Sequence, residues 1–253
     1  MKKTFIFFLI ITVLASSKSS AEELIWYVAA SMLPPAKKVS ELFNQQNKTH
    51  RVLLITGGSG QLFSKIQLSK KGDIYSPASR YYLEVSQING LSKKHSVFLI
   101  QTPVFGISKK GAHKISSFSD LLTPGVKISV GNPQTMALGR LYLKIEEKMQ
   151  AETIKGIRQN ITVKALNVTQ IANYLKRNIV DAGTIFDTVA LAHKIPYIEI
   201  PEDLNITSES FWIELSTGDK GLTVALFKAF IYENIGLFTE YGFKLPPDFQ
   251  VTK

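Results

Sequence analysis

Residues 24–29 read Leu-Ile-Trp-Tyr-Val-Ala, a continuous apolar run from which the interpretation of the whole chain starts. Such a run is typical of a strand that is covered on both faces, as in a parallel sheet flanked by helices. Pro34 and Pro35 follow, where a helix can begin because proline lacks the N–H that the first turn leaves unpaired. Apolar residues at helical spacing then predict an amphipathic helix from Pro35 to about Gln46.

The same alternation of strand and helix recurs along the chain. Residues 51–56 predict a second strand, and a glycine-rich turn leads from it into a second helix that begins near Ser59. A β-α-β-α order implies a parallel sheet with helices on both faces. Further expected strands cover residues 126–130, 161–166 and 181–186, and the expected helices between them cover residues 137–149 and 168–175.

Two segments are candidates for connections between separate lobes. The apolar segment 96–108 is interrupted by Pro103, so a long strand could pass there from one lobe into another. Residues near 200–212 would have to return, because the mostly helical segment 225–242 completes the first lobe. We therefore predict an α/β fold with two lobes, each a mainly parallel sheet flanked by helices: lobe I from residues 22–101 and 206–253, and lobe II from residues 102–205.

Residues 1–21 have the pattern of a signal peptide. Lys2 and Lys3 precede an apolar run over residues 4–14, and small residues occupy positions 19–21. The apolar run is too short for a permanent membrane-spanning helix. The chain has no cysteine, hence no lipid attachment site and no disulfide. We expect an exported protein of the periplasm.

Composition and charge narrow the function classes. The 253 residues are 45% hydrophobic and include no Cys, which excludes a disordered chain and a disulfide scaffold. The formal net charge is +10, but the lysines are scattered as pairs rather than gathered in a stripe with aromatic residues. Nucleic-acid binding would need a concentrated basic patch, so a solvated surface is the better interpretation.

Small polar residues follow the expected strands at Ser31 and Ser59, and Asn167 precedes another expected helix. Helix N-termini bind anions because their first N–H groups are unpaired and carry partial positive charge. In open α/β sheets, ligands lie beyond the carboxyl ends of the strands. The alternative is that these three residues are ordinary helix caps.

Several segments resemble the periplasmic molybdate-binding proteins of ABC transporters, in the same order, between about residue 24 and residue 245. They are Ala29-Ala30-Ser31, the block from Gly58 to Ile66 with Asp73-Ile74-Tyr75 and Ala78, Gly131-Asn132-Pro133 with Gly139-Arg140, Asp181 to Phe186, and Tyr241-Gly242-Phe243. The resemblance implies a two-lobe periplasmic binding protein fold with the ligand in the cleft between the lobes. It also implies a monomer that delivers molybdate or tungstate to a membrane ABC permease, without enzymatic activity and without a cofactor.

The resemblance implies a role for five residues. Ser31 and Ser59 would each give a hydroxyl and a backbone N–H to the oxyanion, and Leu138 and Val168 would each give a backbone N–H. Phe186 stands where the family has a tyrosine whose hydroxyl reaches the anion, so this chain has one donor fewer. Asn132 for aspartate and Pro77 for serine are lesser departures from the family pattern.

The kind of anion follows from the donors. A fully deprotonated oxyanion only accepts hydrogen bonds, so its site should offer donors and no carboxylate, whereas hydrogen phosphate benefits from an acceptor. Asp187 is the acid nearest to a matched position, and its side chain should point to the opposite face of a strand. Molybdate, tungstate and sulfate therefore fit better than phosphate. Sulfate or a small phosphorylated or carboxylated solute is the alternative ligand.

A secreted serine hydrolase is the alternative from another class. A nucleophile elbow needs Gly-x-Ser-x-Gly, but Gln61 stands two residues after Ser59. The four histidines, at positions 50, 95, 113 and 193, match no metal-ligand spacing, so we expect no metal site apart from the oxyanion itself.

Overall fold

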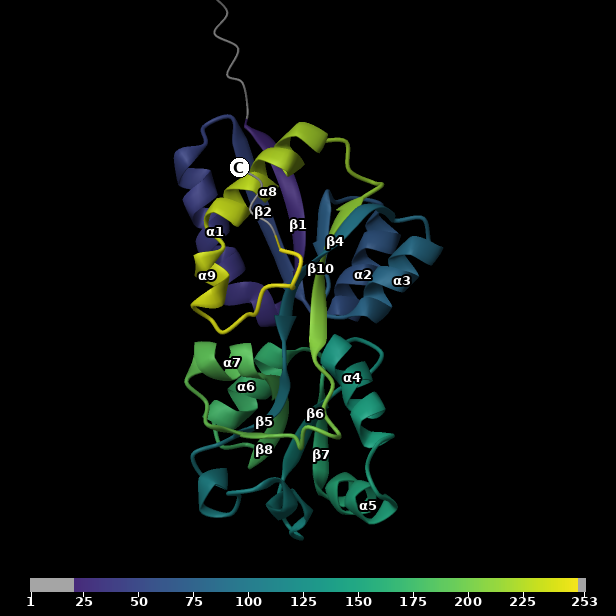
Figure 1. Ribbon diagram of the computed structural model, residues 1–253, viewed down its shortest axis with the longest axis vertical. Coiled ribbons are helices and arrows are strands. Elements are labelled where there is room, and N and C mark those ends of the chain that lie inside the picture. The colour runs from purple at the N-terminus through teal and green to yellow at the C-terminus, as the bar shows by residue number, and fades with distance from the viewer. Residues whose placement is uncertain (1–20, 250–253) are drawn as a thin grey trace, which may run out of the picture.

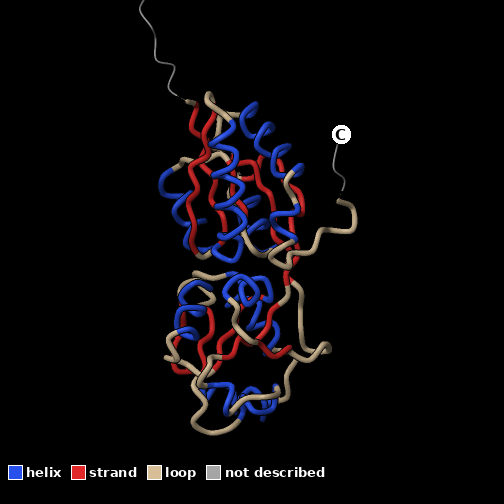
Figure 2. Tube along the Cα trace, turned by 90° about the vertical axis from the view of Figure 1, so that its left-hand side faces the viewer, coloured by secondary structure: helices blue, strands red, loops and turns tan. Residues whose placement is uncertain are grey.

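The strands of the computed structural model, which describes residues 21–249, form two sheets of five strands each (Figure 1). The expected signal peptide lies outside the described residues except for Ala21. We call the part of the chain around one sheet lobe I; its strands lie in the order β2 (His50–Gly57), β1 (Glu22–Ala29), β3 (Ile74–Ser76), β10 (Ser208–Leu215) and β4 (Ser92–Gln101). The part around the other sheet is lobe II, with the strand order β7 (Ile161–Ala165), β6 (Ile128–Gly131), β8 (Ala182–Phe186), β5 (Pro103–Ile107) and β9 (Tyr197–Glu199). Figure 2 shows the two lobes one above the other, each with its own strands and helices.

The elements of lobe I come from both ends of the described chain. They are β1 (Glu22–Ala29), η1 (Ala30–Met32), α1 (Leu33–Gln46), β2 (His50–Gly57), α2 (Ser59–Ser69), β3 (Ile74–Ser76), α3 (Arg80–Ile88), β4 (Ser92–Gln101), β10 (Ser208–Leu215), α8 (Gly221–Glu233) and α9 (Gly236–Thr239). The α1 helix begins two residues before Pro35, and Pro34 and Pro35 occupy its first turn, where no N–H is needed.

The elements of lobe II are contiguous. They are β5 (Pro103–Ile107), η2 (Gly111–His113), η3 (Phe118–Leu122), β6 (Ile128–Gly131), α4 (Ala137–Glu146), α5 (Ala151–Asn160), β7 (Ile161–Ala165), α6 (Val168–Lys176), β8 (Ala182–Phe186), α7 (Asp187–His193) and β9 (Tyr197–Glu199). Among the described helices, none combines the length and the apolar character needed to cross a membrane.

Each sheet is mixed, because one strand runs against the others. In lobe I, β1 is parallel to β2 and β3, whereas β10 is antiparallel to both of its neighbours. In lobe II, β6 is parallel to β7 and β8, whereas β5 is antiparallel to both of its neighbours. The reversed strand is in each case the first one after the chain crosses between the lobes. It starts at the edge of the sheet that faces the other lobe, where the parallel strands end.

At the first crossing between the lobes, β4 leads almost without interruption into β5. Only Thr102 separates the end of β4 from Pro103, the first residue of β5. Proline is tolerated there because it starts a strand and has no N–H to donate to the ladder. The prediction of a long strand broken at Pro103 is confirmed.

The core of lobe I joins the two ends of the described chain. Phe227 of α8 packs edge-on against Trp26 of β1, with ring centroids 5.3 Å apart, and against Phe43 of α1 at 5.0 Å. Trp212 of β10 completes the cluster, 6.1 Å from Trp26. Such aromatic pairs add about 0.5–1.5 kcal/mol beyond the apolar area that they bury. Figure 1 shows the resulting arrangement, with α8 and α9 beside β1 and α1.

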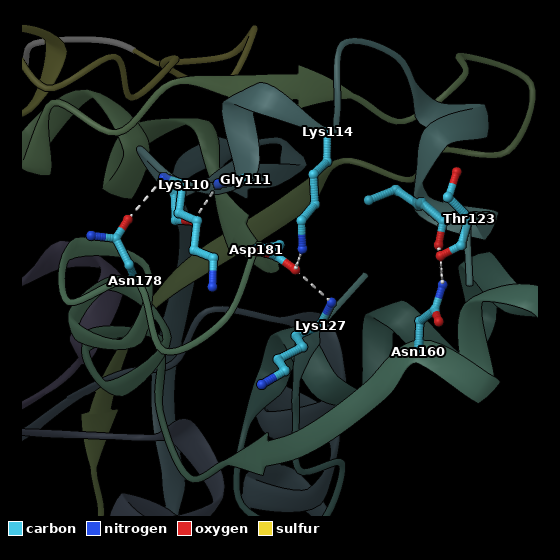
Figure 3. A network of polar contacts seen from close by, with 10 residues as sticks. Lys110, Gly111, Lys114, Thr123, Lys127, Asn160, Asn178 and Asp181 are labelled. Carbon is cyan, nitrogen blue, oxygen red and sulfur yellow. Dashed lines mark hydrogen bonds and ion pairs between the residues drawn. The ribbon is translucent and has the colours of Figure 1, made fainter. Parts of the chain in front are cut away.

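A polar network anchors β8 in lobe II. Asp181, just before β8, is buried, and Figure 3 shows its carboxylate between Lys114 and Lys127. One carboxylate oxygen accepts from the Lys127 amide and from the Lys114 ammonium, each over 3.0 Å. Asp181 therefore anchors the start of β8, at the end of the strand opposite to Phe186.

Candidate functional site

A small cavity lies where the two lobes meet, and the five residues singled out from the sequence all line it. Its volume is about 20 Å³. The cavities that hold drug-sized ligands measure about 300–1,000 Å³, so this one has room for a compact ion and not for a sugar ring. The lining residues are Ala29, Ala30, Ser31, Gly57, Gly58, Ser59, Ala78, Met136, Ala137, Leu138, Val168 and Phe186.

The lining residues with predicted roles lie mostly at the starts of helices. Ser31 is in the 3₁₀ turn that follows β1, and Ser59 is the first residue of α2. Leu138 is the second residue of α4 and Val168 the first of α6, on the opposite side of the cavity. Because the first N–H groups of a helix have no partner within the helix, the cavity is surrounded by backbone donors from both lobes.

The Ser31 hydroxyl has its proton available for a ligand. Ser31 is buried, and its Oγ accepts a hydrogen bond from Nε2 of Gln101 over 3.1 Å. A serine oxygen that accepts from an amide must direct its own proton elsewhere. In the described part of the chain, the Ser31 hydroxyl is therefore hydrogen-bonded to the Gln101 side chain and does not cap a helix.

The Ser59 hydroxyl is held in the same way. Its Oγ accepts from the backbone N–H of Ala78 over 3.1 Å, and its carbonyl accepts from the Tyr75 hydroxyl over 2.8 Å. The proton of Ser59 is thus also available to the cavity. Within residues 21–249, the partner of this hydroxyl is an amide and not a histidine, which does not fit the activated serine of a hydrolase.

Asn167 differs from the two serines, because it is a helix cap. Its Oδ1 accepts from the backbone N–H of Gln170 over 3.1 Å at the start of α6. The cap fixes the first turn of the helix, on which Val168 lies. Of the three residues that could have been caps or ligands, the structure assigns Asn167 to capping.

Phe186 and Asp187 lie side by side in the sequence and point to different places. Phe186 is the last residue of β8, is 1% exposed and lines the cavity. Asp187 is the first residue of α7 and not part of a strand, so the strand argument for its direction is wrong. Its Oδ1 accepts from the amides of Thr102 and Thr188, at 2.9 Å and 2.8 Å, which turns it toward the first crossing. Burial raises the pKa of this carboxyl above its ordinary value.

The lining carries no formal charge. Among the described residues that line the cavity, none has an ionisable side chain. The positive potential in the cavity comes from backbone N–H groups and helix N-termini, and hydroxyl protons add to it. Such a site favours an anion that accepts hydrogen bonds and carries no proton of its own.

The sequence did not show which groups hold the two serine hydroxyls. Gln101 and the Ala78 amide hold the two serine hydroxyls, and Thr188 donates from its Oγ1 to Oε1 of Gln101 over 3.0 Å. The one signal for Gln101 was its place directly after the apolar run of residues 97–100. One of the lesser departures has a local role: Oδ1 of Asn132 accepts from the Gln134 amide in the turn before α4. No cluster of side chains suited to a metal ion occurs within the described residues.

Comparison with known proteins gives a family and a set of relatives. Residues 24–244 match the family model described as bacterial extracellular solute-binding protein. A Haemophilus influenzae protein whose name identifies it only as a binding protein is 28% identical over 156 residues, which cover 62% of this chain and 62% of that relative. The match therefore spans less than two thirds of the relative. The Mycobacterium tuberculosis molybdate-binding protein ModA is 25% identical over 183 residues, 71% of this chain and 67% of that protein.

Solved structures share the fold at low sequence identity. The Azotobacter vinelandii periplasmic molybdate-binding protein has a TM-score of 0.73 and 17% identity, covering 88% of this chain and 99% of its own. The Mycobacterium tuberculosis sulfate-binding protein SubI has a TM-score of 0.76 and 14% identity, covering 90% and 88%. The Actinobacillus pleuropneumoniae protein AfuA, solved with fructose-6-phosphate bound, has a TM-score of 0.68 and 16% identity, covering 87% and 80%.

These likenesses establish the two-lobe periplasmic binding protein fold. The family match covers both sheets and the cavity between them. Together with the fold, it shows that this chain belongs to the bacterial extracellular solute-binding protein family, whose members bind solutes and are not enzymes.

Proposed function

We propose that this protein captures a fully deprotonated tetrahedral oxyanion, molybdate or tungstate, between its lobes and delivers it to a membrane ABC permease. The observation that carries the proposal is the small cavity between the lobes, lined by two serine hydroxyls and helix N-termini and by no ionisable side chain. In this proposal Ser31, Ser59, Leu138 and Val168 donate to the anion, and Phe186 forms an apolar wall. The molybdate-binding relatives support the choice of ligand.

The size and the donors of the cavity weigh against the other ligand classes. A volume of about 20 Å³ leaves no space for a sugar phosphate. Hydrogen phosphate would bring a proton into a site that offers donors and lacks a carboxylate to accept it. Sulfate has the same charge as molybdate and is also fully deprotonated. In this proposal only the radius of the cavity distinguishes sulfate from molybdate and tungstate.

The proposal includes a place and a mode of action. The protein is exported with cleavage after Ala21, acts as a monomer in the periplasm, and encloses the anion by moving residues 102–205 relative to residues 22–101 and 206–253. Intact mass of the protein recovered from the producing cells tests the cleavage, since a chain that begins at Glu22 is expected.

A thermal-shift panel with molybdate, tungstate, sulfate, phosphate and fructose 6-phosphate tests the ligand. A ligand at 100 times its dissociation constant adds about 2.7 kcal/mol to the free energy of unfolding, which raises Tm by several degrees. We expect molybdate and tungstate to raise Tm at lower concentrations than sulfate does, and phosphate and the sugar phosphate to have little effect. A rise with the sugar phosphate alone would overturn the proposal.

A further inference from the structure

Gln101 lies behind the cavity, at the point where β4 ends and the chain crosses into lobe II. It is fully buried, and it is not among the residues that line the cavity. Its side chain touches Ser31 of lobe I on one side and Thr188 of α7 in lobe II on the other. Both partners are also buried, so the three side chains form a polar chain shielded from water.

The chain of hydrogen bonds has a direction. The Thr188 hydroxyl donates a hydrogen bond to Oε1 of Gln101 over 3.0 Å. With its carbonyl facing Thr188, the amide presents its NH₂ group to Ser31 and donates to Oγ over 3.1 Å. The Ser31 proton is therefore left to point into the cavity.

Resting on the proposed function, we propose that Gln101 and Thr188 are positioning residues that hold Ser31 as a hydrogen-bond donor and so make the site prefer fully deprotonated oxyanions over protonated ones. Neither residue touches the ligand. They act through the Ser31 hydroxyl, whose orientation decides whether an anion that carries a proton can fit.

The reason lies in the lone pairs and the single proton of a hydroxyl. A ligand O–H group that donated to Ser31 would leave the serine proton without an acceptor, because Gln101 already donates from behind. The same holds for the Ser59 hydroxyl, since the Ala78 amide already donates to its Oγ. An unmatched buried donor costs about 1–3 kcal/mol, so each misfit weakens a protonated anion by roughly five- to a hundredfold.

Thr188→Val is the sharpest test, because it keeps the shape, removes the hydroxyl and leaves the cavity lining unchanged. Without the donor on Oε1, the Gln101 amide can turn and accept the Ser31 proton. We expect the affinity for molybdate and sulfate to fall about tenfold, and the preference for sulfate over phosphate to shrink. Thr188→Ser keeps the hydroxyl, so this variant should keep the wild-type affinities for molybdate and sulfate.

Thr184→Val is the matched control. Thr184 is fully buried in β8, and within the described residues its Oγ1 has no hydrogen-bond partner. This variant should keep the wild-type Kd for every anion, as measured by titration calorimetry. The Tm of each variant without ligand shows whether the fold is retained.

Gln101→Glu gives a second readout, the pH dependence of binding. An ionised glutamate accepts from Ser31 and Thr188 alike and withdraws the serine proton, whereas the neutral acid can still donate to Ser31. We expect the affinity of this variant for sulfate to fall as pH rises, while that of the wild type stays flat. Because the new charge also repels the anion, the pH profile supports the proposal only together with the Thr188→Val result.

The outcomes separate this inference from the function on which it rests. If Ser31→Ala weakens molybdate binding but Thr188→Val and Gln101→Glu keep the wild-type Kd and the wild-type ratio between sulfate and phosphate, the positioning role is overturned and the proposed function stands. If the wild-type protein binds no oxyanion, both are overturned.

Discussion

The backbone N–H of Gly60 in lobe I donates to the backbone carbonyl of Thr135 in lobe II over 2.9 Å. At this place the two lobes touch, main chain against main chain, beside the cavity. A Cβ atom on Gly58 would lie 2.4 Å from the Thr135 carbonyl oxygen and 2.6 Å from that of Leu166. Glycine is needed at this position because lobe II approaches so closely, and not because of an unusual backbone angle.

Gly58→Ala should therefore weaken ligand binding by keeping the lobes apart. Overpacking costs about 1–3 kcal/mol, which corresponds to roughly a five- to hundredfold loss of affinity. Gly221→Ala is the matched control, because Gly221 begins α8 in lobe I, lies outside the cavity lining, and has room for a methyl with no other atom within 4 Å. Titration calorimetry gives the affinity, and small-angle scattering with and without molybdate follows closure. Equal affinities for the two variants would show that the closed contact contributes nothing.

Ser31→Ala and Ser59→Ala should each weaken molybdate binding. Each removes a hydroxyl proton that points into the cavity, and a hydrogen bond to a charged group contributes about 1.5–3 kcal/mol, or roughly ten- to a hundredfold in affinity. Ser40→Ala serves as control, since Ser40 is also buried in lobe I but lies on α1, outside the cavity lining. Wild-type affinity in both serine variants would refute the assigned site.

Phe186→Tyr tests the residue that stands where the family resemblance calls for a tyrosine. The phenolic hydroxyl would add one donor to a cavity that already has the other four groups, and the charge-assisted bond should tighten molybdate and tungstate by about 1.5–3 kcal/mol. Titration of both proteins with molybdate, tungstate and sulfate measures the change. Weaker binding would mean that the added oxygen competes with the ion for the small cavity, and no change would mean that the ring belongs to the core.

Asp181→Asn should destabilise the protein in a pH-dependent way. Burial alone raises the pKa of Asp181, but the Lys127 amide and the Lys114 ammonium outweigh it, so the pKa lies below its ordinary value of 3.8. The carboxylate thus stabilises the fold fully above the pKa of the unfolded chain, and this contribution is lost as pH falls through the lowered pKa. We expect a loss of about 1.5–3 kcal/mol at pH 7 that shrinks below pH 4.

Denaturant unfolding of wild type and Asp181→Asn between pH 7 and pH 3 measures this difference. Asp203→Asn is a suitable control, because Asp203 is exposed and its carboxylate has no ion pair within the described residues. A destabilisation by Asp181→Asn that stayed constant down to pH 3 would mean that the charge of the carboxylate is not what holds β8.

The alternation of strands and helices and the two serines that follow strands could be predicted from the residues alone. Both depend on short-range features, namely apolar runs, helical spacing and the small or polar residues where strands lead into helices. For this reason Ser31 and Ser59 could be singled out from the residues themselves, whereas Leu138, Val168 and Phe186 were implied by the family resemblance. The structure brings all five together at one cavity. The break of the long strand at Pro103 is equally local.

What those residues can do depends on contacts between segments that are distant in the sequence. The direction of the Ser31 proton depends on Gln101, 70 residues away, and the orientation of Gln101 depends on Thr188, 87 residues further along. The reversal of β10 and β5, the turn of Asp187 toward the crossing and the contact between Gly60 and Thr135 likewise join segments that are distant in sequence. Local patterns carry no information about such pairs, because each contact forms only when separate elements pack against one another.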